Sequence, residues 1–287
     1  MHNPKCAANH FGPWAVEVGW FRQAVEAVRS GVWAMAEPPD PKEMRMAYVM
    51  GDGDLALFSI DGPITRGQSK YGGTSSVELR QGIRAAANDP KVNGIFVTVD
   101  SPGGTVAGTA ELADEIRAAN TKKPVFAYVE GQAASAAYWA VAHAERISAS
   151  STSMVGSIGA FAVLEDTSKA AELAGIKVHV VSSGALKGAG VPGTAVTEDQ
   201  ISETQAIVDE VAEIFFSDVR AGRSMGVAEI NAVKDGRLLT ASMARKMKLI
   251  DGAESFEAAY SRAIEKSKPA KKSKLARAEA GIRLAEQ

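Results

Sequence analysis

Two largely apolar runs, at residues 94–99 and 124–129, mark the first half of the chain. Runs of this length between turn-forming residues are typical of buried strands. Between residues 54 and 186 the order is strand, helix, strand, helix, strand, which predicts an α/β fold with parallel strands joined by helical crossovers. Apolar residues at helical spacing predict a further long helix over about residues 198–222.

Ser135 and Lys187 are the candidate catalytic residues. Ser135 follows the run at residues 124–129, and Lys187 follows the alternating segment 177–181, which predicts another strand. Each therefore lies on a small-residue loop at a strand end. A serine nucleophile needs a base, and a lysine can serve when its amine is neutral. We therefore expect Lys187 to be buried among apolar neighbours.

The four histidines do not provide the base that the candidate serine needs. His143 lies on the same predicted helix as that serine but roughly 12 Å along it, at 1.5 Å rise per residue. His179 lies in the strand pattern of residues 177–181, where a half-buried packing role is expected. His2 and His10 belong to an N-terminus without a clear pattern. The elimination favours a Ser/Lys pair over a Ser/His pair.

Gly103 and Gly104 follow the first apolar run and precede a helical pattern over residues 105–120. Adjacent glycines leave backbone amides accessible, and a helix that follows them adds partial positive charge. Together with the amide of Ala136, next to the candidate serine, they are the expected oxyanion hole of an acyl transfer. A Pro-Gly-Gly sequence by itself is also typical of an ordinary turn.

Four spaced motifs together resemble the S49 family of peptidases, which includes signal peptide peptidase A and the head-maturation proteases of tailed bacteriophages. They are Asp-Ser-Pro-Gly-Gly at 100–104, Ala-Ser-Ala-Ala-Tyr at 134–138, Gly-Ser-Ile-Gly at 156–159 and Ser-Gly-x-x-Lys at 183–187. The resemblance covers about residues 54–262. It implies a ClpP/crotonase-like spiral of βαβ units with a C-terminal helical segment.

The resemblance assigns the nucleophile to Ser135, the general base to Lys187, the lysine-orienting hydroxyl to Ser157 and the oxyanion segment to Gly103 and Gly104. For Ser157 the residues alone predict only a turn. Ala136 and Ala137 replace glycines that are usual in signal peptide peptidases, and Gly188 replaces a frequent acidic residue. Phage-type members tolerate such alanines, which favours that branch of the family.

The resemblance implies a serine endopeptidase with a Ser/Lys dyad that processes capsid or scaffold proteins in phage or prophage head assembly. It also implies polypeptide substrates and a ring-forming homo-oligomer. The reaction expected of such an enzyme requires no metal and no cofactor. A soluble hydrolase of signal peptides or general peptides, of the signal peptide peptidase A type, is the alternative with the same chemistry. Two alternatives from other classes are a catalytically silent assembly protein and a crotonase-like acyl-CoA enzyme.

Composition limits the partners of the chain. With 287 residues, 46% of them apolar, it can bury one good-sized core or two small ones. A formal charge of −2 gives no reason to expect nucleic acid. The single cysteine, Cys6, excludes an internal disulfide. Neither a signal peptide nor an apolar stretch of about 18 residues is visible, so we expect no membrane anchor and a place in the bacterial cytoplasm or the assembling phage prohead.

Three parts are expected along the chain: an N-terminal arm with a Pro-rich linker (1–41), a peptidase domain (42–265) and a basic, flexible tail (266–287). Residues 11–36 of the arm are rich in aromatic residues and partly helical in pattern. They pack either on a neighbouring subunit or on the core of the same chain.

Overall fold

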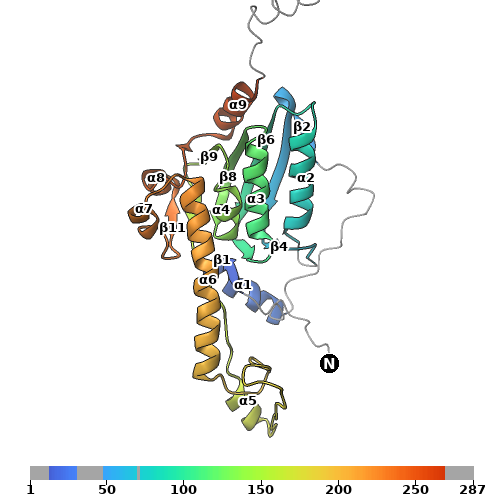
Figure 1. Cartoon of the computed structure of the whole chain (residues 1–287), viewed down its shortest axis with the longest axis vertical. Coiled ribbons are helices and arrows are strands. Elements are labelled where there is room, and N and C mark those ends of the chain that lie inside the picture. Colours follow the sequence, from blue (N-terminus) through green and yellow to red (C-terminus); the bar gives the residue numbers. More distant parts are fainter. Residues whose placement is uncertain (1–12, 31–47, 70–71, 269–287) are drawn as a thin grey trace, which may run out of the picture.

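The computed structural model describes residues 13–30, 48–69 and 72–268. The Pro-rich linker at 38–41, Cys6, His2, His10 and the tail beyond residue 268 lie outside these ranges, so the predictions about them are not tested. Residues 13–30 of the N-terminal arm are described, and they lie against the same chain (Figure 1).

The described strands form two sheets. The larger has the order β11-β10-β8-β6-β3-β2, with β9 beside β8 and β12 beside β9, and the smaller has the order β1-β7-β4-β5. The strands are β1 (Trp14–Val16), β2 (Val49–Gly51), β3 (Leu55–Asp61), β4 (Ile64–Thr65), β5 (Thr74–Ser75), β6 (Gly94–Ser101), β7 (Gly103–Thr105), β8 (Val125–Ala134), β9 (Arg146–Ala149), β10 (Met154–Gly156), β11 (Leu238–Thr240) and β12 (Gly252–Ala253).

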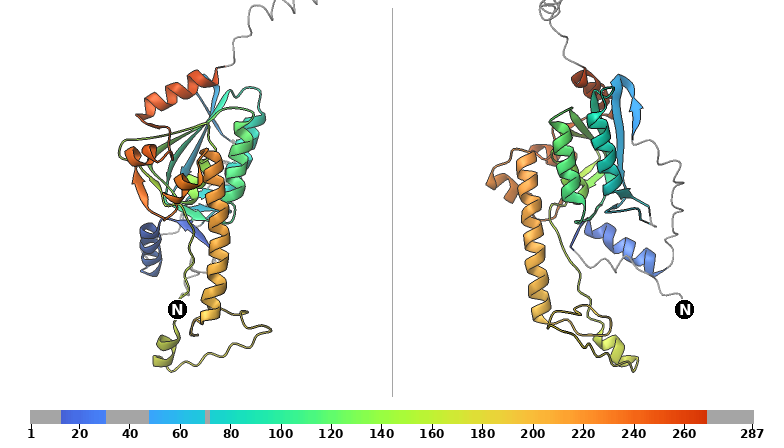
Figure 2. Two further views of the ribbon diagram at one scale, coloured as in Figure 1. Left: turned by 60° about the vertical axis from the view of Figure 1, so that its left-hand side comes forward. Right: turned by 45° about the vertical axis from the view of Figure 1, so that its right-hand side comes forward.

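Helices cover both faces of the larger sheet (Figures 1 and 2). They are α1 (Val18–Arg29), the short 3-10 helix η3 (Asp52–Asp54), α2 (Ser76–Asn88), α3 (Thr109–Asn120), α4 (Ala136–Val141), α5 (Ser168–Leu173), α6 (Glu198–Gly222), α7 (Val227–Asn231), α8 (Ala241–Lys246) and α9 (Phe256–Ser267).

The central strands are parallel: β6 pairs with β3 and β8, and β8 pairs with β9 and β10. Alternate side chains of β6 point to opposite faces, as a strand requires. Ile95 and Val97 join the main core under α2 and α3, while Phe96 joins a smaller cluster with Phe126 under α9. Because both faces are covered, the run from Ile95 to Val97 is apolar on both sides. The prediction of an α/β fold with helical crossovers and a C-terminal helical segment is confirmed.

Several local predictions were wrong. Residues 177–181 form no strand, and His179 is exposed rather than half-buried. Gly103 and Gly104 lie in the strand β7 instead of a turn, and helix α3 begins only at Thr109. Helix α4 ends at Val141, so His143 lies beyond it. The long helix, in contrast, has the predicted bounds.

Helix α6 extends beyond the body of the molecule together with the segment before it, residues 162–197, which we call the projecting loop (Figures 1 and 2). All the buried residues of α6 lie in its C-terminal half: Ala212, Phe215 and Val219. The far end of the helix is closed by a capping box, in which Thr197 and Gln200 each accept the other's backbone N–H through their side chains.

Among the described helices, none has the combined length and apolar character needed to cross a bilayer.

Trp139 joins α4 to α6 at the base of this extension. Its buried ring stacks on Phe215 with centroids 4.5 Å apart, and its Nε1 donates to Asp218 Oδ2 over 2.7 Å. His143 Nε2 lies 3.1 Å from the other carboxylate oxygen of Asp218. Next to Trp139, the Tyr138 hydroxyl donates to the Leu249 carbonyl, and burial raises the pKa of that phenol. Helix α4 is therefore held from two sides.

We predict that Trp139→Ala lowers the free energy of unfolding by about 3–5 kcal/mol, because it removes a buried ring and leaves a cavity. Urea unfolding followed by circular dichroism measures this. Gln81→Ala, at an exposed position of α2, is the control and should change the value by less than about 0.5 kcal/mol. Equal effects of the two substitutions would contradict the assigned role of Trp139.

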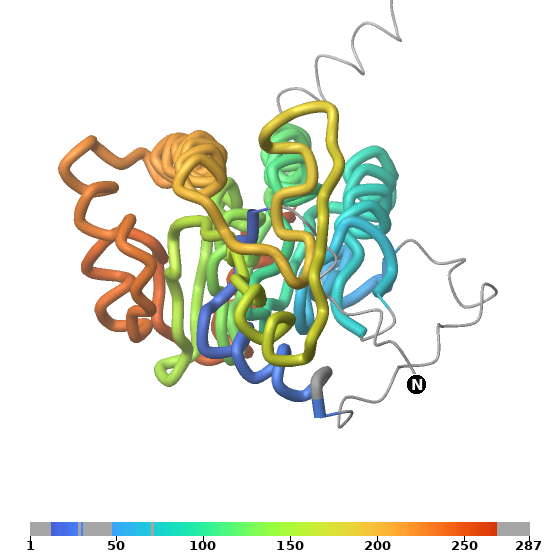
Figure 3. The backbone as a smooth tube through the Cα atoms, turned by 90° about the horizontal axis from the view of Figure 1, so that it is seen from below, coloured from blue at the N-terminus to red at the C-terminus, as the bar shows by residue number. Residues whose placement is uncertain are grey.

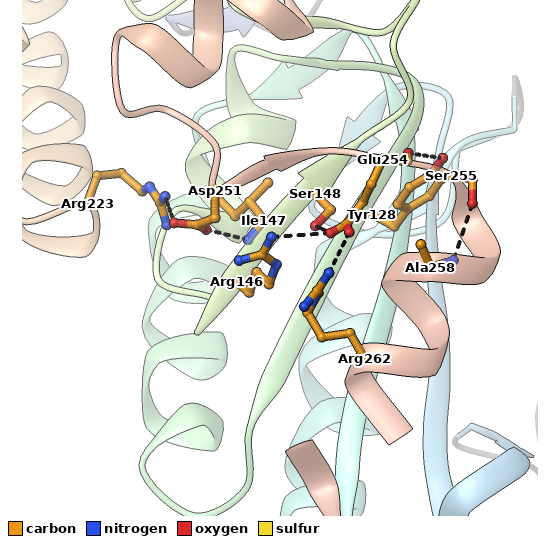
Figure 4. A network of polar contacts seen from close by, with 10 residues as sticks. All are labelled: Tyr128, Arg146, Ile147, Ser148, Arg223, Asp251, Glu254, Ser255, Ala258 and Arg262. Atoms are coloured by element: carbon orange, nitrogen blue, oxygen red, sulfur yellow. Dashed lines mark hydrogen bonds and ion pairs between the residues drawn. The ribbon is translucent and has the colours of Figure 1, made fainter. Parts of the chain in front are cut away.

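A polar network fastens the C-terminal part of the chain to β9 (Figure 4). The Glu254 carboxylate accepts hydrogen bonds from Ser148 Oγ (2.6 Å), Arg262 Nη2 (2.9 Å) and Arg146 Nη2 (3.3 Å). Burial raises the pKa of Glu254, but the hydrogen bonds from Ser148, Arg262 and Arg146 outweigh it, so the pKa lies below its usual value. The ionised carboxylate is therefore the form that stabilises the fold.

A carboxyl group whose pKa is lowered on folding contributes stability above the pKa of the unfolded chain, about 4.3 for Glu, and loses it as the pH falls through the folded value. We predict that Glu254→Gln costs about 1–3 kcal/mol at pH 7, as hydrogen bonds to a charged group are lost. The variant should also lose less stability than the parent on acidification. Urea titrations between pH 7 and pH 3 test this, with the exposed Glu203→Gln as control. Parallel pH profiles for parent and Glu254→Gln would refute it.

Candidate active site

Ser135 occupies a strained backbone position between β8 and α4. Its φ of 53° and ψ of −119° lie in a region that favours glycine. Its N–H donates to the Gly156 carbonyl over 2.7 Å, and its carbonyl accepts from Trp139 N over 2.9 Å. The hydroxyl donates to the Gly159 carbonyl over 3.4 Å, and the residue is only 1% exposed. Hydrogen bonds on both sides thus hold the serine in place.

Ser157, one strand away, also has a positive φ. β8 and β10 are parallel, with Ala134 opposite Gly156, so Ser135 and Ser157 are the next residues on adjacent strands. Neighbouring strands lie about 4.8 Å apart, which places the two serines side by side. Ser157 has a φ of 52°, is buried, and donates its N–H to the Arg237 carbonyl over 2.8 Å. The structure brings these two predicted residues together.

Gly103 lies next to the turn between β8 and α4 that carries Ser135. Its φ is 98°, and a Cβ added there would lie 2.9 Å from the Ala134 carbonyl oxygen and 3.0 Å from the Ala136 amide nitrogen. The backbone of β7 therefore passes the residues on both sides of Ser135. The structure thus brings together the predicted nucleophile, Ser135, and two of the predicted oxyanion positions, Gly103 and Ala136.

Gly104 allows this approach by having no side chain. A Cβ at Gly104 would lie only 1.8 Å from the Ile64 carbonyl oxygen of the neighbouring strand β4. Backbone atoms cannot move aside for a methyl group as a flexible side chain can. The glycine pair is thus required by strand packing, a stronger reason than the turn that its sequence predicts.

Two residues of the site were not singled out by sequence. Ser101, fully buried, donates its hydroxyl to the Gly62 carbonyl and accepts the Gly103 N–H over 3.2 Å. Its hydroxyl therefore occupies the single N–H of Gly103, one of the candidate oxyanion amides. Gly159 provides the carbonyl that accepts from Ser135 Oγ. Both belong to motifs quoted above, and only the pairing of distant strands reveals their contacts.

Lys187 is not among the residues brought together. It is exposed in this chain, contrary to the expected burial, and its backbone N–H donates to Gly184 within the projecting loop. That loop is held by its own hydrogen bonds: Gly193 N–H donates to Thr167 Oγ1 and Val196 N–H to the Asp166 carboxylate. It extends away from the sheet, as the views agree (Figures 1 and 2).

In the described part of the chain, no group of three or more His, Cys, Asp or Glu side chains is arranged to hold a metal ion. The groups that the structure brings together are hydroxyls and backbone amides.

The model of peptidase family S49 matches residues 117–269, which include Ser135, Ser157 and Lys187. The chain belongs to this family. Among S49 and related proteins, it is 29% identical to capsid assembly protease C of Escherichia phage lambda, over 65% of this chain and 43% of the relative. It is also 29% identical to Protease 4 of Salmonella typhi, over 75% of this chain and 35% of the relative. The chain thus spans less than half the length of these two relatives.

Among solved structures, the ClpP catalytic domain of Plasmodium falciparum aligns with 70% of this chain and 86% of its own length. The TM-score is 0.43, and the sequence identity is 13%.

We predict that Ser135→Gly is more stable than Ser135→Ala by about 1 kcal/mol, because only glycine relieves the positive φ. Both variants lose the hydroxyl, so their difference isolates the backbone strain. At Ser101, which lies in β6 and has no positive φ, the order should be reversed by about 0.5–1 kcal/mol. Urea unfolding of the four variants measures both differences. If the alanine variant were the more stable one at Ser135 as well as at Ser101, Ser135 would not be strained.

Proposed function

We propose that this S49 chain is a serine endopeptidase whose nucleophile is Ser135. The observation that carries the proposal is the left-handed backbone of Ser135 where β8, α4 and β7 meet. Strain of this kind persists only where the surroundings enforce it, and it gathers at functional sites. Here it aims a hydroxyl at a corner with the backbone amides of Gly103 and Ala136 nearby, the components that acyl transfer requires.

In the proposed reaction, Lys187 Nζ accepts the proton of Ser135 Oγ as that oxygen bonds to the substrate carbonyl carbon. The negative oxygen of the tetrahedral intermediate is stabilised by the amide of Ala136 together with that of Gly104, or with that of Gly103 once its N–H leaves Ser101 Oγ. The C–N bond then breaks, and the lysine returns its proton to the leaving amine. Water, deprotonated by the same lysine, then bonds to the acyl carbon, the ester C–O bond to Ser135 breaks, and the lysine returns the proton to Ser135 Oγ. Ser157 is proposed to orient the amine.

We propose further that the lysine comes from a neighbouring copy of the chain. Lys187 is exposed on a loop that extends away from Ser135, whereas a base must lie within about 3 Å of the hydroxyl it deprotonates. The loop also presents apolar side chains to solvent, with Leu173 90% and Val181 97% exposed. Exposed apolar groups of this kind mark a protein contact. A second copy, seated on this surface, would enclose the amine of Lys187 beside the Ser135 of that copy.

Supply of Lys187 by one copy to the next is a head-to-tail contact. Such contacts generate rings when the rotation closes. We therefore propose a ring-forming homo-oligomer in which each site takes Ser135 from one subunit and Lys187 from the next. The exposed Ile201 and Ile207 on the unsupported half of α6 extend the same surface.

The proposed biological role is processing of capsid or scaffold proteins in phage or prophage head assembly, within the bacterial cytoplasm or the prohead. The likeness to capsid assembly protease C supports this role. The likeness to Protease 4 keeps a general or signal-peptide hydrolase as the second candidate. Coexpression with capsid proteins from the same gene neighbourhood, read by intact mass, separates the two. Cleavage of the capsid protein at one site favours head assembly, and equal degradation of any unfolded protein favours the second candidate.

We predict that Ser135→Ala and Lys187→Ala are each inactive on fluorescent casein, and that coexpressing the two restores about a quarter of the parent activity. Random mixing of equal amounts in a ring pairs an intact Ser135 with an intact Lys187 at about one site in four. Two different affinity tags, used in sequence, isolate the mixed oligomer for the assay. Lys169→Ala, on the same loop, is the matched control and should keep full activity.

Three outcomes would overturn parts of this proposal. Activity in Lys187→Ala alone would exclude that lysine as the base. An inactive mixed oligomer of normal size, with an active parent, would exclude a dyad shared between subunits. An inactive parent, in an intact oligomer, would favour the silent assembly protein.

A further inference from the structure

The N-terminal strand β1 lies beside β7, close to the backbone around Ser135. It pairs antiparallel with β7, with Ala15 opposite Gly104 and Val16 opposite Gly103. The pairing is extended by hydrogen bonds from Glu17 N–H to the Pro102 carbonyl (2.7 Å). β7 has β4 on its other edge, so β1 takes the edge that would otherwise be open.

β1 is also held along its second edge. Trp14 and Phe161 form an antiparallel bridge in which each backbone N–H donates to the other's carbonyl, over 2.7 and 2.9 Å. The strand is therefore enclosed between β7 and Phe161, with Ala15 0% and Val16 2% exposed. Backbone pairing on two sides with two small apolar side chains buried is how a groove holds an extended peptide.

The strand reaches the proposed catalytic corner. A Cβ added at Gly103 would lie 2.3 Å from the Ala15 carbonyl oxygen, and the same point is 3.0 Å from the Ala136 amide nitrogen. The carbonyl of β1 thus lies close to a proposed oxyanion donor. Any substrate that pairs with β7 next to Ser135 would need the edge that β1 fills.

The attachment of this segment is small. Of the described side chains in residues 13–30, only Ala15 and Val16 are buried. After β1, Glu17 ends the strand by accepting the Gly19 and Trp20 N–H groups at the start of α1. The helix is held by Phe21, whose ring lies 5.4 Å from both the Trp14 and the Phe161 rings. A three-residue strand with so little buried surface is among the segments that open first.

We propose that β1 is an internal occupant of the substrate groove, and that an extended peptide with small or β-branched apolar residues at the two buried positions displaces it. The inference rests on the proposed function, since it names what blocks the site and what class of peptide replaces it. Figure 3 shows the N-terminal segment and the projecting loop at the same end of the molecule. The chain would then regulate its own site by competition, without a further partner.

Peptide binding tests the proposal apart from catalysis. The probe is a fluorescein-labelled peptide with the sequence of residues 13–18, Pro-Trp-Ala-Val-Glu-Val, and the protein is the full chain carrying Ser135→Ala, which blocks cleavage. Phe21→Ala is added to loosen the segment, and Ala15→Asp to expel it, because a carboxylate without a partner is costly to bury. Gln23→Ala, exposed on the same helix, is the control.

Fluorescence anisotropy should give a Kd at least tenfold lower for the Phe21→Ala and Ala15→Asp proteins than for the control. A peptide with Asp in place of its Ala should bind none of them. Equal affinity for all proteins, or no binding to any, would overturn the proposal and show β1 to be a fixed part of the fold. If Ala15→Asp fails to fold, as circular dichroism would reveal, Phe21→Ala alone decides.

The same two substitutions with Ser135 intact separate this inference from the proposed function. Faster casein hydrolysis, with tighter peptide binding in the Ser135→Ala background, supports both. Tighter binding without hydrolysis supports the internal occupant and refutes the peptidase. Hydrolysis at the parent rate with unchanged binding refutes the internal occupant alone.

Discussion

The in-register parallel pairing of β8 with β10 is the constraint on which the site depends. Because Ala134 faces Gly156, the next residue on each strand is a serine at the same height, and both serines turn into left-handed backbone. The N–H of Ser135 is bonded to the carbonyl of Gly156, so the turn is fixed from the neighbouring strand. A shift of one residue in this pairing would separate the two hydroxyls and move Ser135 away from Gly103.

Elements with long, self-consistent signals were predictable from sequence. The run at 94–99 became β6, because a strand covered on both faces is apolar throughout. Helix α6 has the predicted bounds, because Thr197 caps its first turn and apolar residues recur at helical spacing. The role of Ser135 was inferred from the motif at 134–138, and the structure adds that its backbone is strained. For the motif at 100–104, the structure adds that Gly104 has no room for a side chain.

Features that depend on distant partners were not predictable. β1 has three residues, and its stability comes from β7 and Phe161, about 90 and 145 positions further along the chain. Residues 177–181 show the reverse case, because their alternation predicts a strand but no strand in the described chain pairs with them. Lys187 is likewise exposed where its sequence predicted burial. The proposed contact between subunits would supply surroundings that the local sequence does not encode.

The capping box at the far end of α6 has a consequence for association. Thr197 and Gln200 satisfy the first amides of the helix where no body of the protein supports it, so this end is ordered by its own residues. A surface that is already rigid loses little conformational entropy when it docks. More of the interaction energy then appears as affinity, and a contact between subunits can form at lower concentration than one that must first fold.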